Sequence, residues 1–206
     1  MFKLEHRFSK SDVVTLSRKS AYSGFLKVDR IRLQHRMFNG DLSPPILREI
    51  LVRDRAVGVL LFDPKREEIV LVRQFRVGLM DDLEEAWILE IVAGMVGENE
   101  QFSDVAIRET EEESGCKILE LIEICEYYNS PGITNEKVIL YCGLIDTTDA
   151  GGIHGLKEEH EDIESIVLPY RDALQCLSSG KIKNPMTIIA LQWLMLNKSD
   201  IKENVI

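Results

Sequence analysis

The sequence has little of what marks disordered or fibrous proteins. Its 206 residues include only 4 cysteines, 6 prolines and 13 glycines, while 45% are hydrophobic and 29% are charged. This balance excludes a low-complexity chain and is typical of a globular protein. The length suffices for one or two domains with a hydrophobic core.

Long hydrophobic runs are also lacking. Runs such as AVGVLLF, residues 56–62, have about a third of the ~20 apolar residues that a membrane-spanning helix needs. The first residues, MFKLEHRFSK, contain no apolar core of a signal peptide. We therefore expect a cytoplasmic protein that does not interact with membranes.

Basic residues are fewer than acidic ones, 25 against 35, so the formal net charge is −10. This excludes general attraction to the backbone of a nucleic acid. A phosphorylated substrate is still compatible with it, because a bound divalent cation can reverse the local charge. The cysteines lack the CxxC spacing of a zinc site, and we expect them to be reduced and mostly buried. They are Cys116, Cys125, Cys142 and Cys176.

Short apolar runs separated by turn residues predict a sheet in the middle of the chain. Residues 56–62 and 68–75 flank the turn DPKRE and predict a hairpin, and further strands are predicted at 87–94, 118–124 and 138–145. The first fifty residues contain β-prone pieces and a turn-rich NGDLSPP segment. We therefore predict a small strand-rich N-terminal subdomain, residues 1–49, and a larger domain, residues 50–206.

Three helices are predicted. One spans roughly residues 103–114, with Ser103 as its N-cap and Gly115 as its stop. A second follows Pro169 and stops at Gly180, and the last begins near Pro185. Mixed with the strands in this order, they predict an α/β fold with a sheet between helices.

An acidic cluster lies in the C-terminal half of the first predicted helix. At 3.6 residues per turn, Glu109, Glu112 and Glu113 fall on one narrow face, and the helix dipole disfavours each by roughly 0.3–1 kcal/mol. Arg108 offsets only part of this through its i,i+4 relation to Glu112. A solvated face is the simplest interpretation. However, glycines frame the cluster and a buried-looking strand precedes it, which favours a functional site, and converging carboxylates are the ligands that Mg²⁺ prefers.

The segment GMVGENEQFSDVAIRETEEESGC, residues 94–116, resembles the Nudix box. In that motif a Gly precedes a Glu by five intervening residues, and seven more lead to Arg-Glu-aliphatic-any-Glu-Glu-any-Gly-aliphatic. Thr110 and Cys116 stand where aliphatic residues are usual, but both are small enough to pack. So many matches at fixed spacing are far more specific than a short glycine motif. The matching residues are Gly94, Glu100, Arg108, Glu109, Glu112, Glu113 and Gly115.

Other stretches extend the resemblance over almost the whole chain. They include YSGFLKVDRIRLQHRMFNG, VLVRQFRVG, NSPGITNE and GIHGLKEEHEDIE, and they are similar to the bacterial Nudix branch that hydrolyses ADP-ribose. The resemblance implies a Nudix α/β/α sandwich around a mixed β-sheet, with Mg²⁺ as cofactor and Mn²⁺ as a substitute. The implied products are AMP and ribose 5-phosphate. Two alternatives stay open: hydrolysis of another nucleotide-sugar such as GDP-mannose, and a catalytically silent regulator that binds ADP-ribose.

The resemblance also implies roles for single residues of the box. Glu109 and Glu113 would bind Mg²⁺ directly, with the backbone carbonyl of Ala93, while Glu112 would share a metal or its water. Arg108 would hold these carboxylates in place. Two further positions shape the loop before the helix: Gly94 would permit its close approach, and Glu100 would brace it.

A second acidic patch covers residues 158–164, after the glycine-bearing GGIHG. Taken alone it reads as a solvated, flexible loop. The resemblance instead implies that Glu159 is the catalytic base and that Glu161 joins the metals when the loop closes. Because the two residues are only two positions apart, either could be the base.

The remaining candidates concern the substrate. The resemblance implies that Arg76 contacts a phosphate or ribose, although a charge at the end of a strand needs no ligand. Ser130 and Glu136 match substrate-contact positions, although a turn built on Ser-Pro-Gly, residues 130–132, needs no ligand to explain it. Phe25 and Arg48 resemble a pair that contacts adenine across a homodimer with exchanged N-terminal subdomains. Simple core packing is the alternative for Phe25.

Overall fold

The structure is a computed structural model that describes residues 7–82 and 85–205, with side chains up to residue 201. It divides into two compact units. The N-terminal unit comprises Met1–Asp54 and Tyr128–Glu136, and the sandwich unit comprises Arg55–Tyr127 and Lys137–Ile206. The division predicted between residues 49 and 50 falls within a strand, Ile46–Val52. The functions predicted for the two parts stay predictions.

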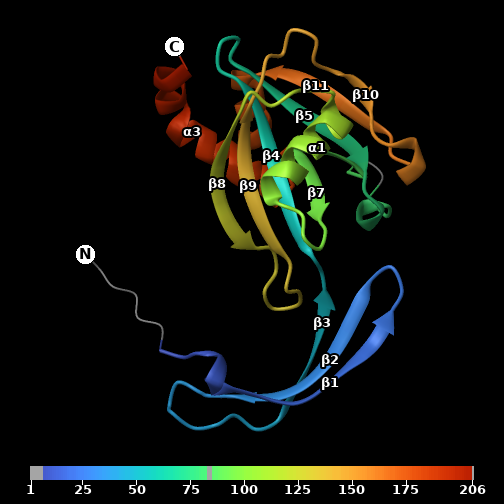
Figure 1. The fold of residues 1–206 in the computed structure, drawn as a ribbon, viewed down its shortest axis with the longest axis vertical. Helices are drawn as coiled ribbons and strands as arrows, with labels where there is room; N and C mark the ends of the chain where they lie inside the picture. Colours follow the sequence, from blue (N-terminus) through green and yellow to red (C-terminus); the bar gives the residue numbers. More distant parts are fainter. Residues whose placement is uncertain (1–6, 83–84, 206) are drawn as a thin grey trace. The chain divides into compact units, whose positions relative to one another are not determined.

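The N-terminal unit is a three-stranded antiparallel sheet, drawn in blue in Figure 1. A 3₁₀ turn, η1 (Lys10–Asp12), leads into β1 (Val13–Ser23), β2 (Lys27–His35) and β3 (Ile46–Val52). The β-prone pieces of the sequence lie mainly in β2. Strand β1 was not predicted, because all of its residues are exposed and it shows no buried face. Among the described residues of this unit, Ser43 is the one that is buried.

The sandwich unit is built on an eight-stranded mixed sheet (Figure 1). Its main path runs β10-β11-β5-β4-β9-β8, with β4 antiparallel to β5 and parallel to β9. The predicted hairpin and the predicted mixture of strand directions are therefore confirmed. The strands of this path are β4 (Arg55–Asp63), β5 (Glu68–Phe75), β8 (Glu120–Tyr128), β9 (Lys137–Leu144), β10 (Gly152–His154) and β11 (Ile163–Pro169).

The strand predicted at residues 87–94 is wrong in one respect, since it forms two strands. β6 (Trp87–Glu90) pairs with the end of β5, whereas β7 (Val92–Val96) pairs with the start of β4. Strands β4 and β5 pair with each other only over Leu61–Asp63 and Glu68–Val70, so the two short strands continue the sheet where they diverge. The uniformly apolar sequence gives no sign of the break at Ile91, which is buried in the core.

Helices cover both faces of the sheet. The helix α1 (Phe102–Ser114) packs on the face of Val57, Val59 and Val70, while α2 (Tyr170–Ser178) and α3 (Pro185–Val205) pack on the opposite face. This confirms the predicted α/β/α sandwich. Two 3₁₀ turns complete the unit, η2 (Val77–Leu79) and η3 (Lys157–Glu159). None of the described helices is both long and apolar enough to cross a bilayer.

The ends of α1 show one wrong prediction and one correct one. Gln101, not Ser103, is the N-cap residue, because the helix starts at Phe102; the Ser103 hydroxyl contacts the Asp104 carboxylate instead of a backbone N–H. Gly115 ends the helix in the left-handed conformation, with φ of 69°. Of the cysteines, Cys116 and Cys142 are buried, and the other two are half-buried.

Candidate functional site

Helix α1 turns its acidic face toward strand β7. Val105, Ala106 and Thr110 anchor the helix in the core, and Glu113, one turn after Glu109, is itself 3% exposed. The backbone N–H of Ala93 donates a hydrogen bond of 3.1 Å to Oε2 of Glu113. The end of the sheet and the helix therefore place a buried carboxylate beside the backbone of Ala93.

Gly94 makes this close approach feasible. A Cβ atom at this position would overlap the carboxylate of Glu109. Gly94 therefore leaves room for the Glu109 side chain between α1 and β7. The preceding loop is held by Glu100, whose Oε2 accepts a hydrogen bond of 2.7 Å from the N–H of Gly97.

Arg108 lies against two carboxylates of the same helix. Its guanidinium group is 2.9 Å from Oε2 of Glu112 and 3.0 Å from Oε1 of Glu109. The i,i+4 contact with Glu112 is the one that helix geometry predicts. Because Arg108 is about two-fifths exposed, its cation stabilises the cluster only partly.

The two inner carboxylates are hard to ionise. Burial, assisted by the negative charges of Glu109 and Glu161 and opposed by the Ala93 hydrogen bond and the Arg76 charge, raises the pKa of Glu113 to about 8. Burial also raises the pKa of Glu109 to about 7, against Arg108. With these pKa values Glu113 is mostly protonated and Glu109 about half protonated at pH 7, so a cation bound beside them would favour their ionised forms.

The two departures from the box pack without strain. Thr110 is fully buried, and its hydroxyl donates a hydrogen bond of 2.7 Å to the carbonyl of Ala106 in the preceding turn. Cys116 is also buried, just after Gly115. The buried hydroxyl of Thr110 therefore has its hydrogen-bond partner within the helix.

The second acidic patch lies beside the first. The N–H of Gly155 donates a hydrogen bond of 3.0 Å to the carbonyl of Glu112, which ties the start of this loop to α1. Oε2 of Glu161 accepts a hydrogen bond of 3.1 Å from the N–H of Leu156, and the Glu161 charge acts on both Glu109 and Glu113. Glu159 is exposed in the turn η3. The structure therefore brings Glu161, and not Glu159, into the carboxylate cluster.

Arg76 approaches the cluster from the end of β5. Its positive charge acts on Glu113, and its Nε donates a hydrogen bond of 2.7 Å to Oε2 of Glu90. Oε1 of Glu90 accepts a hydrogen bond of 2.6 Å from Asn184. We did not single out Glu90 from the sequence, although a charged residue between apolar ones in a predicted strand is a signal that could have identified it.

The other predicted substrate residues lie in the N-terminal unit. Phe25 is 96% exposed in the turn between β1 and β2, so core packing within the described chain does not explain it. Arg48 lies exposed on β3. Glu136 accepts a hydrogen bond of 2.7 Å from Asn129, while the carbonyl of Ser130 accepts two backbone N–H groups of its turn. Nothing in these contacts requires or excludes a substrate.

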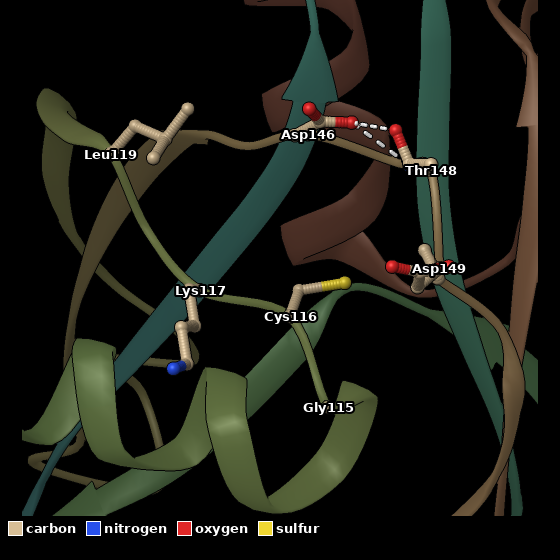
Figure 2. Close-up of a pocket in the computed structure, with 8 residues that line it drawn as sticks. Gly115, Cys116, Lys117, Leu119, Asp146, Thr148 and Asp149 are labelled. Carbon is tan, nitrogen blue, oxygen red and sulfur yellow. Dashed lines mark hydrogen bonds between the residues drawn. The ribbon is translucent and has the colours of Figure 1, made fainter.

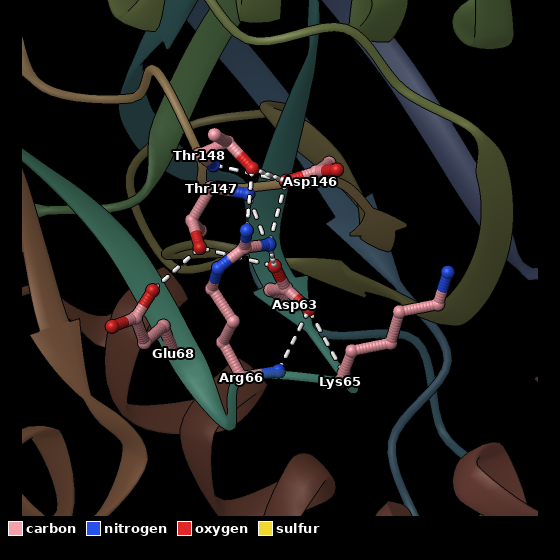
Figure 3. A network of polar contacts seen from close by, with 7 residues as sticks. All are labelled: Asp63, Lys65, Arg66, Glu68, Asp146, Thr147 and Thr148. Carbon is pink, nitrogen blue, oxygen red and sulfur yellow. Dashed lines mark hydrogen bonds and ion pairs between the residues drawn. The ribbon is translucent and has the colours of Figure 1, made fainter.

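Two polar features of the sandwich unit lie apart from the carboxylates. A pocket of about 310 Å³ opens beyond Gly115, where Lys117, Asp146 and Thr148 line it (Figure 2). Of the predicted site residues, Gly115 alone is among its lining residues. Beside it, the buried Asp63 accepts hydrogen bonds from the turn after β4 and from Thr147 (Figure 3).

The donor set at α1 suits a hard divalent cation. Carboxylate oxygens of Glu109, Glu112, Glu113 and Glu161 and the carbonyl of Ala93 are oxygen ligands, which Mg²⁺ and Mn²⁺ prefer. In residues 7–82 and 85–205, however, no three acidic, imidazole or thiolate side chains converge on one point as they stand. Arg108 occupies oxygens of two of the carboxylates. The raised pKa values of Glu109 and Glu113 fit a cation site, because a bound cation would favour the ionised form of both carboxylates.

Comparison with known proteins finds relatives that match most of the chain. The NUDIX domain model matches residues 52–187. The chain is 43% identical over 195 residues to an ADP-ribose pyrophosphatase of Escherichia coli (strain K12), covering 95% of this chain and 93% of that protein. It is 38% identical to an ADP-ribose pyrophosphatase of Haemophilus influenzae, covering 99% of this chain and 95% of that protein.

A GDP-mannose pyrophosphatase of Escherichia coli O1:K1 / APEC is more distant. It is 31% identical over 152 residues, which cover 73% of this chain and 78% of that protein. Among solved structures, an ADP compounds hydrolase superposes with a TM-score of 0.71 at 19% identity, covering 95% of this chain and 99% of that one. At this identity the superposition supports the fold.

Proposed function

The chain belongs to the NUDIX domain family, and we propose that it is a hydrolase that splits the diphosphate of ADP-ribose into AMP and ribose 5-phosphate. The observation that carries this proposal is the packing of two carboxylates of α1 against β7: Glu113 accepts a hydrogen bond from Ala93, and Glu109 lies against Gly94. The charge of Glu161 acts on both carboxylates. Relatives named for ADP-ribose hydrolysis match almost the whole chain, whereas the GDP-mannose relative matches less of it. This difference favours ADP-ribose as the substrate.

A divalent cation, Mg²⁺ or in its place Mn²⁺, would be held by Glu109, Glu113 and the carbonyl of Ala93, with Glu112 and Glu161 contributing. When bound, it would neutralise the diphosphate and lower the pKa of a water. The protein's own part is to supply ionisable oxygens. Arg108 keeps Glu112 turned toward the cluster, and the Ala93 N–H fixes the orientation of Glu113.

The proton of the attacking water needs an acceptor. Glu161 is already drawn into the carboxylate cluster and held by Leu156, which supports a role in metal binding. Glu159 is exposed and lies in the turn η3, where movement of the loop could bring it to the water. We therefore assign the base to Glu159 and the metal role to Glu161.

Five further residues are proposed to bind the substrate. Arg76 lies beside the carboxylates, where its guanidinium group suits a phosphate, and Ser130 and Glu136 would contact the rest of the nucleotide-sugar. Phe25 would stack on adenine, with Arg48 beside it, across a homodimer with exchanged N-terminal subdomains. The exposed position of Phe25 supports this stacking.

The N-terminal sheet supports the homodimer further. It has no buried hydrophobic residue among those described, yet it carries many exposed large hydrophobic ones. Such a surface marks an interaction site, and a second copy of the chain would cover it. The exposed residues include Val13, Val14, Leu16, Tyr22, Leu26, Phe38, Leu42 and Leu47. Sedimentation velocity tests the dimer, and a monomer at working concentration would contradict it.

Turnover on a panel of nucleoside diphosphate compounds tests the reaction. The purified chain is incubated with ADP-ribose, GDP-mannose and other nucleotide-sugars, with and without Mg²⁺, and the products are separated by chromatography. We expect AMP and ribose 5-phosphate from ADP-ribose, only with the cation. A strong preference for GDP-mannose would overturn the substrate, and binding of ADP-ribose without turnover would favour the silent regulator. We further propose that the reaction takes place in the cytoplasm.

A further inference from the structure

Three segments of the sandwich unit meet behind Arg76. They are the residue after β5, Arg76, the last residue of β6, Glu90, and the residue before α3, Asn184. Both oxygens of the buried Glu90 carboxylate are occupied: Oε2 by Nε of Arg76 at 2.7 Å and Oε1 by Nδ2 of Asn184 at 2.6 Å. A buried carboxylate needs such full pairing.

The orientation of Asn184 is fixed on its other side. Its Oδ1 accepts a hydrogen bond of 3.2 Å from the N–H of Thr187, so it caps the helix, and its carbonyl accepts one from Ile188. The hydroxyl of the fully buried Thr187 in turn accepts a hydrogen bond of 3.0 Å from the N–H of Ile91, the residue after Glu90. Because these contacts fix Oδ1 of Asn184 toward the helix, its Nδ2 amino group is turned toward Glu90.

Arg76 uses Nε for Glu90 and not the outer edge of its guanidinium group. Among the described residues, neither of its terminal amino groups has a hydrogen-bond partner, and its side chain is 43% exposed. Two parallel donors on a fixed plane match the oxygens of a phosphate. An ion pair in which one partner is this exposed contributes little to stability, so stability alone explains the arrangement poorly.

We infer that Glu90 and Asn184 are positioning residues for the reaction: together they hold Arg76 so that its terminal amino groups face a phosphate of the substrate. This inference rests on the proposed function for the identity of that phosphate. The holding of Arg76 itself depends only on the three side chains. Glu90 is 14 residues from Arg76 and 94 residues from Asn184 in the sequence. The start of α3, a helix on the far face of the sheet, thus takes part in orienting a group at the catalytic face.

A double-mutant cycle on kcat/KM for ADP-ribose tests the inference. Asn184→Ser keeps a cap for α3 but is too short to reach Glu90. We expect a loss of about tenfold for this variant and of about tenfold to a hundredfold for Arg76→Ala, as for hydrogen bonds to charged groups. The double variant should be no worse than Arg76→Ala. Additive losses would show that Asn184 acts apart from Arg76 and would overturn the inference.

Asn197→Ser is the matched control. Its amide donates to the carbonyl of Trp193 within α3 and does not touch Glu90, so kcat/KM should stay within about twofold of the wild type. An equal loss in this control would point to a general effect on the helix and would contradict the inference.

A second measurement does not depend on turnover. In ¹⁵N-labelled protein, the Nε–H signal of Arg76 is assigned by its loss in Arg76→Ala. In Asn184→Ser it should shift and exchange faster with water, and in Asn197→Ser it should not. An unchanged signal in Asn184→Ser overturns the inference even if hydrolysis occurs. If no diphosphate is hydrolysed but the signal moves as expected, the proposed function fails and the holding of Arg76 stands.

Discussion

The backbone N–H of Ala93 and Oε2 of Glu113 are joined by a hydrogen bond of 3.1 Å that links strand β7 to helix α1. The bond favours the ionised carboxylate, but burial acts against it more strongly and raises the pKa of Glu113 to about 8. The carboxylate is therefore oriented for a cation before it is fully ionised.

Glu113→Gln should abolish hydrolysis and leave the fold intact. The amide has the same shape and can still accept from Ala93, but it cannot supply a charged oxygen. We expect turnover to fall by about a hundredfold or more, while the metal-free protein at pH 8 is at least as stable as the wild type. Rate measurements and urea unfolding check both outcomes. Glu111→Gln, on the exposed side of α1, is the control and should change neither.

The stability of the metal-free protein should fall as the pH rises. The folded-state pKa values of Glu113 and Glu109, about 8 and about 7, lie above the ordinary value of 4.5, so the native state binds the protons more tightly. The stabilisation that the protonated Glu113 and Glu109 contribute is fully present below pH 4.5 and is lost as the pH rises from 4.5 to 8. Added Mg²⁺ should therefore stabilise more at pH 8 than at pH 5 and should release protons on binding. Urea unfolding and calorimetry in two buffers measure these effects; stabilisation that does not vary with pH would contradict the assignment.

Gly94→Ala should impair the cation site. The new Cβ would overlap the carboxylate of Glu109 and push it away from β7. We expect Mg²⁺ affinity to fall about tenfold, with turnover falling alongside it, as when groups that orient a metal ligand are disturbed. Gly78→Ala is the control, because nothing lies within 4 Å of its Cβ position. Titration calorimetry with Mg²⁺ compares the two variants, and equal affinities would argue against a ligand role for Glu109.

Asp63→Asn should destabilise the sandwich unit. Burial opposes ionisation of Asp63, but hydrogen bonds from Thr147, Arg66 and Lys65 outweigh it and lower its pKa to about 2 (Figure 3). Because this pKa lies below the ordinary 3.8, the stabilisation is present above pH 3.8 and is lost as the pH falls toward 2. In Asp63→Asn, the NH₂ group of the new amide would face the groups that donate hydrogen bonds to Asp63. We therefore expect the free energy of unfolding to fall by about 2–3 kcal/mol at pH 7.

Thermal and urea unfolding at pH 7 measure this loss. Asp149→Asn, an exposed neighbour in the same loop region, is the control and should change the free energy of unfolding by less than about 0.5 kcal/mol. Equal stability of Asp63→Asn and the wild type would mean that the network in Figure 3 contributes nothing.

Phe25→Ala should affect substrate binding and not stability. With 96% of its surface exposed, the side chain contributes no packing in the described chain. If it stacks on adenine, the KM for ADP-ribose should rise by about tenfold, because base stacking contributes roughly 1–3 kcal/mol. Phe38→Ala, another exposed aromatic in the same unit, is the comparison. An unchanged KM in Phe25→Ala would remove the adenine role.

The sandwich unit was predictable because its strands are buried on both faces. Strands such as β4 and β9 are nearly continuous apolar runs, and turn residues separate them clearly. The same uniformity concealed the break at Ile91, since hydrogen-bonding partners, not residue types, divide β6 from β7. Strand β1 could not be predicted for the opposite reason: none of its residues is buried, so its sequence does not alternate between apolar and polar residues.

The candidate site was predictable where its residues are close in sequence. Fixed spacing on one helix places Glu109, Glu112 and Glu113 together, and it also predicts the contact between Arg108 and Glu112. Contacts over long separations leave no such trace. Glu90 meets Asn184 only because β6 ends where α3 begins, which depends on how the layers pack.

The hydrogen bond from Gly155 to the carbonyl of Glu112 fastens one end of the acidic loop to the helix that bears the metal-binding candidates. Any swing of Glu159 must then pivot about a point that is fixed to those carboxylates. A shift of α1 would carry the pivot with it, so the proposed proton acceptor would move together with the proposed cation ligands.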